Sequence, residues 1–268
     1  MLSWIFAAFV TLLASTMGAL TGFGFALIFV PMLLLLFDVH TTVILNIMLS
    51  SISAYVLTYI ERRRVLFKLV RNLFLASLVG LPPGILLFRL ADVTLLKATV
   101  SIVSILASVL LLAGIKWSGA EKKWSEFAAG GIAGFLSGSI GIPGPPIILL
   151  LGYRGIPKEN FRATTLAYFA LIVSVTFPLL IISEPNPAST IRYGLTLLPF
   201  VIGGQFIGSH FFNKVPQKHF QIVIPVLIIV MSTYSLISSL VSLFESIRKT
   251  GLPGEIVLFI IFKLLFHL

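Results

Sequence analysis

The chain has 268 residues, of which 58% are hydrophobic and only 10% are charged, and its mean hydropathy is +1.09. No water-soluble core buries so many apolar side chains, so the composition excludes a soluble domain and indicates an integral membrane protein. The net charge of +10 comes from basic residues in short loops, which is typical of the positive-inside rule and not of nucleic-acid binding.

Eight apolar segments of about membrane-spanning length follow one another along the chain. They lie at about 2–37, 42–60, 69–90, 94–114, 126–152, 160–183, 191–212 and 219–243. A further apolar run, 256–266, is short for a span and carries Lys263, so we expect an interfacial or loosely packed helix there. The first segment would form a helix of about 54 Å against a hydrocarbon core of about 30 Å, so it should contain a break.

Glycine-rich stretches interrupt the first and the fifth of these segments. The first contains Gly18 to Gly24, with the sequence GALTGFG, and the fifth contains Gly134 to Gly141, with the sequence GFLSGSIG. Backbone groups freed by a break at membrane depth must be satisfied by protein, water or a bound solute. Matched breaks in two halves of a chain are typical of a transport site between internal repeats.

The predicted fold is therefore an all-α membrane protein of two inverted repeats. Each repeat has four helical segments, and the first segment of each is broken or re-entrant at its glycine-rich motif. A hairpin enters and leaves on the same side of the membrane, so each repeat crosses the membrane three times. Because three is an odd number, the second repeat has the opposite orientation to the first. The predicted division is a first repeat at 1–115, a linker at 116–125, a second repeat at 126–243 and a short apolar tail at 244–268.

The side chains near the breaks are neutral and rich in hydrogen-bond donors. All acidic residues lie at segment ends or in loops, which disfavours a cation mechanism built on a buried carboxylate. Helix N-termini carry partial positive charge, so two half-helices aimed at one point suit a small anion. The candidate substrate-binding residues are Thr21, Gly22, Gly24, Asn46, Ser137, Gly138, Ser139, Gly141, Thr164, Thr165 and Gln205. For these residues the alternative is a role in packing between helices.

Two further residues are candidates for gating or coupling. His210 is a histidine within a predicted span, so it would be the proton carrier of a proton-coupled mechanism. Arg162 begins the sixth segment and could form a cationic gate for an anion. The alternatives are a structural histidine and an arginine that anchors its helix at the membrane interface.

Signatures of catalysis are missing from the sequence. There is no G-x-S-x-G, H-E-x-x-H, Walker A or C-x-x-C motif, and the four histidines are scattered along the chain. The chain also has no cysteine. We expect no enzyme activity, no bound metal and no cofactor.

These features resemble the TauE/SafE family of sulfite and organosulfur-anion permeases. The resemblance covers residues 4–243 and rests on the glycine-rich segments followed by proline, the four-plus-four arrangement and the sequence Arg162-Ala-Thr-Thr165. Phe25 and Ile142 stand where the family pattern has small residues. The resemblance implies a secondary transporter in the cell membrane that moves sulfite, a sulfonate such as sulfoacetate or a related organic anion by alternating access.

The expected partners are a small anionic substrate and the lipid bilayer, with no nucleic acid, and a homodimer is compatible with the sequence. Two other functions stay open at this point. One is a non-transporting scaffold or assembly subunit whose glycines serve only helix packing. The other is an anion channel.

Overall fold

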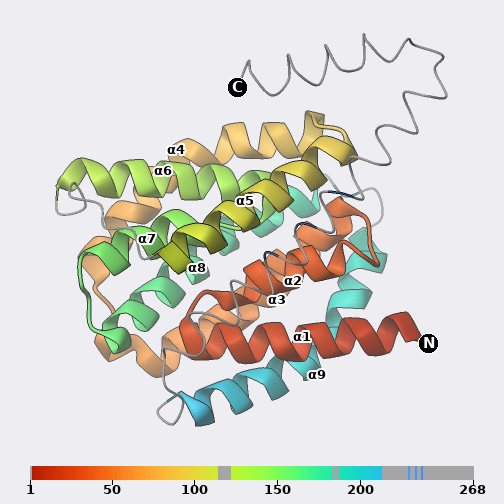
Figure 1. The fold of residues 1–268 in the computed structure, drawn as a ribbon, viewed down its shortest axis with the longest axis horizontal. Coiled ribbons are helices and arrows are strands. Elements are labelled where there is room, and N and C mark those ends of the chain that lie inside the picture. The colour runs from red at the N-terminus through yellow and green to blue at the C-terminus, as the bar shows by residue number, and fades with distance from the viewer. Residues whose placement is uncertain are drawn as a thin grey trace.

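The computed structural model describes residues 2–113, 122–182, 184, 187–212 and the single positions 229, 233 and 237. These residues form nine α-helices and one short 3-10 turn (Figure 1). In chain order they are α1 (Leu2–Thr21), α2 (Gly24–Leu33), α3 (Val39–Glu61), η1 (Arg62–Arg64), α4 (Phe67–Leu90), α5 (Val93–Ala113), α6 (Lys123–Ile140), α7 (Gly144–Tyr153), α8 (Lys158–Ile181) and α9 (Pro187–Phe211).

Most of the predicted segments correspond to one helix each: α3, α4, α5, α8 and α9. The two long predicted segments, 2–37 and 126–152, each contain two helices. The predicted eighth segment lies outside the described residues except for three single positions, and the tail at 244–268 lies outside them entirely.

Five of the described helices are long and apolar enough to cross a membrane. These stretches are Ser3–Thr21, Val39–Arg64, Phe67–Leu90, Lys158–Ile181 and Pro187–Phe211. Their outer faces carry large exposed apolar side chains, such as Val79 at 78% exposure and Phe206 at 76%. Water would make such faces costly, whereas lipid tails solvate them, so the structure agrees with the membrane character predicted from composition.

A left-handed glycine follows the last residue of both α1 and α6. Gly22 has a φ of 86° and Gly141 has a φ of 71°, a region that glycine enters without strain. The Gly22 N–H donates to the Gly18 carbonyl at 2.8 Å, and the Gly141 N–H donates to the Ser137 carbonyl at 3.2 Å. These bonds close the last turn of each helix before the chain reverses into α2 and α7.

Glycines also let two pairs of helices approach closely. A Cβ on Gly134 of α6 would lie 2.1 Å from the Ser77 carbonyl oxygen of α4, and a Cβ on Gly204 of α9 would lie 2.5 Å from the Leu12 carbonyl oxygen of α1. Small residues at such contacts are typical of helix packing in membranes. Both pairs join a helix from one half of the chain to a helix from the other half.

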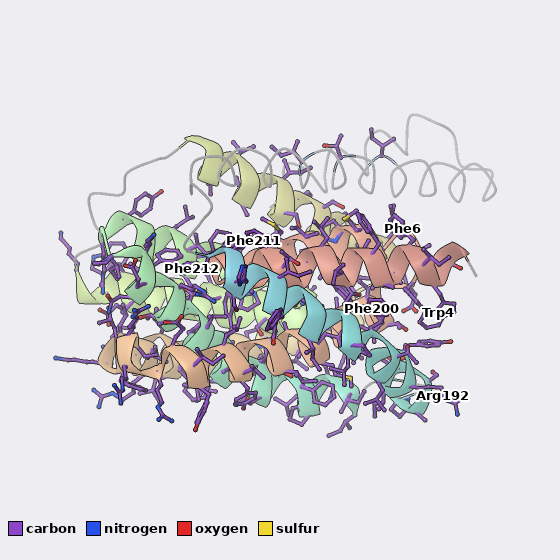
Figure 2. The ribbon with its side chains drawn as sticks, turned by 90° about the horizontal axis from the view of Figure 1, so that it is seen from below. Trp4, Phe6, Arg192, Phe200, Phe211 and Phe212 are labelled. Carbon is purple, nitrogen blue, oxygen red and sulfur yellow. The ribbon has the colours of Figure 1, made fainter. Side chains whose placement is uncertain are left out.

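α3 and α8 contact each other, and α3 also contacts the α1–α9 pair while α8 contacts the α4–α6 pair. Figure 1 shows α4 and α6 along one edge of the molecule, α1 and α9 along the opposite edge, and α2, α3, α7 and α8 between them. Figure 2 shows α1 and α9 side by side, with Trp4 near the start of α1 and Phe211 at the end of α9. In the apolar stretches of α1, α3 and α8 about half of the residues are buried, against a third in those of α4 and α9.

Candidate functional site

A small cavity lies between the two helix breaks. Gly18 and Gly22 line it from the first break, and Gly141 and Gly144 line it from the second. Its free internal volume is about 30 Å³, which is room for about two water molecules. Two segments far apart in sequence thus meet at one internal space in the centre of the bundle.

The walls of the cavity come from the two central helices. α3 contributes Ser50, Ser53 and Ala54, and α8 contributes the apolar residues Leu166, Phe169 and Val173. No charged side chain belongs to the lining within the described residues, and none of their His, Cys, Asp and Glu side chains form a cluster that could hold a metal ion. The described lining of the cavity is therefore uncharged.

The first turn of α2 contributes two residues, Phe25 and Ala26, to the cavity lining. The N–H groups of Phe25 and Ala26 lie in that turn, where an N–H has no intrahelical partner, and both residues line the cavity. The partial positive charge of a helix N-terminus therefore acts there. In α7 the corresponding turn contains Pro145 and Pro146, which have no N–H, so the second break offers fewer donors than the first.

The hydroxyl of Thr21 is used by the first break itself. It donates to the Met17 carbonyl at 2.8 Å and accepts from the N–H groups of Phe23 at 3.2 Å and Gly24 at 3.0 Å. These are the contacts of a side chain that caps the start of a helix, here α2. Neither Thr21 nor Gly24 lines the cavity. A Cβ on Gly24 would lie 3.1 Å from the Thr21 Oγ1.

Each break is braced by a central helix from the other half of the chain. The Asn46 side chain on α3 is fully buried and donates to the Gly141 carbonyl at 2.7 Å. Its Oδ1 has no hydrogen-bond partner among the described residues. At the first break, a Cβ on Gly22 would lie 3.2 Å from the Cα of Arg162 on α8. The two breaks thus depend on contacts that span the sequence.

Five of the predicted substrate-binding residues serve other contacts. Ser137 pairs with Thr176 at 3.0 Å and Ser139 donates to the Phe135 carbonyl at 2.8 Å. The Thr164 hydroxyl accepts from the Leu66 N–H at 3.2 Å, and Thr165 donates to the Phe161 carbonyl at 2.9 Å. A Cβ on Gly138 would lie 2.7 Å from the Leu81 carbonyl oxygen of α4. None of the five lines the cavity.

Two further candidates, Gln205 and His210, are on α9 and do not line the cavity. Gln205 on α9 is buried, and its Nε2 has no hydrogen-bond partner in the described part of the chain. His210 is exposed at the end of α9, with its ring against Phe211. Neither side chain belongs to the lining.

Arg162 is 4% exposed and forms an ion pair with Glu61, the last residue of α3, at 3.2 Å. Its guanidinium carbon also lies 4.1 Å from the centre of the Phe212 ring. The pair ties the end of α3 to the start of α8, next to the first break.

Sequence reasoning missed the two serines of the cavity wall. Asn46, Ser50 and Ser53 are spaced four and three residues apart, which places them on one face of α3. That spacing was the available signal, because polar side chains on one face of an apolar helix point toward a common partner.

A scan against protein-family models matches residues 7–235 of the chain to the family described as sulfite exporter TauE/SafE. A search of curated proteins and a search of solved structures found no significant match. The family match covers most of the chain and agrees with the resemblance seen in its motifs. The chain therefore belongs to the TauE/SafE family, whose members are multi-pass membrane transporters for small anions and not enzymes.

Proposed function

We propose that this protein is a secondary transporter that binds a small anion, such as sulfite, a sulfonate or a related organic anion, in the cavity between the two helix breaks. The observation that carries the proposal is that both breaks border one internal space with an uncharged lining. The N–H groups of Phe25 and Ala26, which have no partner within α2, would supply positive potential without a buried counter-charge. A cation would find no carboxylate there.

The proposal treats the two halves as inverted repeats, with α1 and α2 equivalent to α6 and α7, α3 to α8, and α4 to α9. The helix contacts support this assignment. Exchanging the halves turns the α4–α6 contact into the α9–α1 contact and the α4–α8 contact into the α9–α3 contact, and all four are present. Repeats of opposite orientation provide one route to the central site from each side of the membrane.

In this proposal the parts that move during alternating access are not the two halves of the sequence. The close backbone contacts join α1 to α9 and α4 to α6, so each pair moves as one body. The site opens and closes where these two bodies contact α3 and α8. The interior free space of about 30 Å³ holds about two water molecules, so under this proposal the site widens when an oxyanion binds.

Arg162 serves as the gate in this proposal. Its ion pair with Glu61 closes the bundle at the end that carries the basic turn Arg62–Arg64, which the positive-inside rule places on the cytoplasmic side. Opening that end separates α3 from α8 and breaks the pair. The freed guanidinium beside Gly22 would then meet the anion as it enters.

Purified full-length protein in proteoliposomes tests the function. The expected result is saturable uptake of radiolabelled sulfite or methanesulfonate above that of protein-free vesicles. Ala54→Leu, which places a larger side chain in the cavity wall, should abolish this uptake, while Ala188→Leu on the exposed start of α9 should not. Non-saturating conductance would indicate a channel, and the absence of flux for every anion tested would indicate a non-transporting protein.

A further inference from the structure

A row of polar side chains follows one face of α3. Asp38, Thr42, Asn46 and Ser50 are spaced four residues apart, so each lies one turn beyond the last. Asp38 is exposed, Thr42 and Asn46 are fully buried, and Ser50 lines the cavity. The row therefore extends from the surface at the start of α3 to the internal space between the two breaks.

Two oxygens in the middle of this row have no hydrogen-bond partner. The Thr42 Oγ1 and the Asn46 Oδ1 are both buried, and neither is paired with another described residue. Thr11, a fully buried threonine of α1, instead donates its hydroxyl to the Ala7 carbonyl at 2.7 Å. A buried polar atom without a partner is costly, so two of them one helical turn apart indicate a common ligand.

The ligand of these two oxygens should carry positive charge. The Asn46 amide nitrogen donates to the Gly141 carbonyl at 2.7 Å, and the amide oxygen that remains can only accept. The same bond holds this oxygen beside the end of α6, where carbonyl groups without intrahelical partners give partial negative charge. An anion would be repelled at this place.

The available oxygens favour sodium over other cations. Hydroxyl, amide and carbonyl oxygens are ligands for hard cations, and the broken helices of transporters use such oxygens to bind sodium. A divalent cation would need carboxylates, and the nearby Asp38 carboxylate is exposed and accepts from the Thr41 N–H at 3.0 Å. The packing is also close, since a Cβ on Gly141 would lie 3.1 Å from the Val43 Cγ1, which favours sodium over the larger potassium.

We propose that Thr42 and Asn46, together with backbone carbonyls at the end of α6, bind a sodium ion that is coupled to the transported anion. This inference rests on the proposed transport function and adds a coupling ion and a second site to it. Gly141 borders both the cavity and the sodium site. An anion in the cavity supplies the negative charge that the sodium ligands lack, so each ion strengthens the binding of the other by the same factor.

Thermal unfolding of the full-length protein in detergent tests the sodium site independently of transport. Sodium chloride should raise the melting temperature in a saturable manner above that in equal concentrations of potassium chloride or choline chloride. Thr42→Val keeps the shape of the side chain and removes one ligand oxygen, so it should weaken sodium binding about tenfold. In choline chloride this variant should be at least as stable as the unmodified protein, because it no longer buries an unpaired hydroxyl.

Two further variants serve as controls. Thr11→Val removes a buried hydroxyl that already has a partner, so it should leave the sodium dependence unchanged. Thr42→Ser keeps the ligand oxygen and should retain most of the sodium affinity. In proteoliposomes an inward sodium gradient should increase sulfite uptake over an equal potassium gradient, and Thr42→Val should remove that increase.

The outcomes separate this inference from the function on which it rests. Equal melting temperatures in sodium, potassium and choline, or a sodium effect that Thr42→Val leaves unchanged, would overturn the inference and indicate that these oxygens bind only water. Saturable sulfite uptake that does not depend on sodium would also overturn it, while still supporting a transporter. Sodium binding that requires Thr42, without flux of any anion, would support the sodium site and contradict the proposed function.

Discussion

Replacing Thr21 by valine tests how the first break is held in place. The substitution keeps the shape of the side chain and removes the hydroxyl that accepts from the N–H groups of Phe23 and Gly24. A lost cap costs about 1 kcal/mol, and leaving two partly buried donors unpaired adds to it, so we expect a total of about 2 kcal/mol. For a protein of this size that corresponds to a fall in melting temperature of about 4 °C.

Thr11→Val is the matched control. Thr11 lies on the same helix and its hydroxyl donates to the Ala7 carbonyl at 2.7 Å, but it caps no backbone N–H. That substitution should therefore change the melting temperature by less than Thr21→Val. Thr21→Ser keeps the cap and should restore most of the lost stability.

The assay is thermal unfolding of the purified protein in detergent, together with anion uptake in proteoliposomes. We expect Thr21→Val to lower uptake as well, because a loosened first turn of α2 disorders the cavity that it borders. Equal losses of stability in Thr21→Val and Thr11→Val would refute the capping role. Normal stability with lost uptake would instead return Thr21 to the role of a direct substrate ligand.

Three other variants follow from the same structure. Gly134→Ala should destabilise the protein by about 3 kcal/mol, because its Cβ would lie 2.1 Å from a backbone carbonyl oxygen of α4, whereas Gly152→Ala, which meets nothing within 4 Å, should be nearly neutral in thermal unfolding. Asn46→Ala should cost about 2 kcal/mol in the same assay, since it leaves the buried carbonyl of Gly141 without its 2.7 Å partner; full stability would show that the carbonyl finds another donor. Burial raises the pKa of the Glu184 carboxyl above its ordinary value, so the folded state favours the protonated form. Its stabilising contribution is present below the ordinary glutamate pKa and is lost as pH rises through the folded-state pKa; Glu184→Gln should remove this part of the pH dependence of melting, and an unchanged pH profile would contradict it.

The helices and the need for breaks were predictable, because apolar length and glycine content act locally. A first segment too long for one crossing required an interruption, and the structure has a left-handed Gly22 within it. The function of each glycine was harder to predict. Gly134 and Gly138 were assigned to the second break, but they lie inside α6 and pack against α4. A glycine can form either a turn or a close contact between helices. Which role it has depends on whether another helix packs against it.

The candidate site shows the same limit. The Thr21 hydroxyl accepts from the N–H groups of Phe23 and Gly24, because a hydroxyl close to a helix start finds backbone N–H groups within reach. A role for Thr21 in substrate binding stays a prediction. Ser50 and Ser53 were not among the predicted site residues, because the cavity that they line forms only when α3 and α8 pack together. The pairing of α1 with α9 and of α4 with α6 depends on long-range contacts that no local pattern specifies.

Methaneseleninate provides the most direct measurement of where the anion binds. It is a monoanion with one methyl group, its selenium is located by anomalous scattering, and the chain has no cysteine with which it could react. A crystal structure of the full-length protein with this anion should show selenium in the cavity beside the first turn of α2, bordered by Gly22 and Gly141. Selenium bound only elsewhere, with the space between the two breaks closed and empty, would contradict the account.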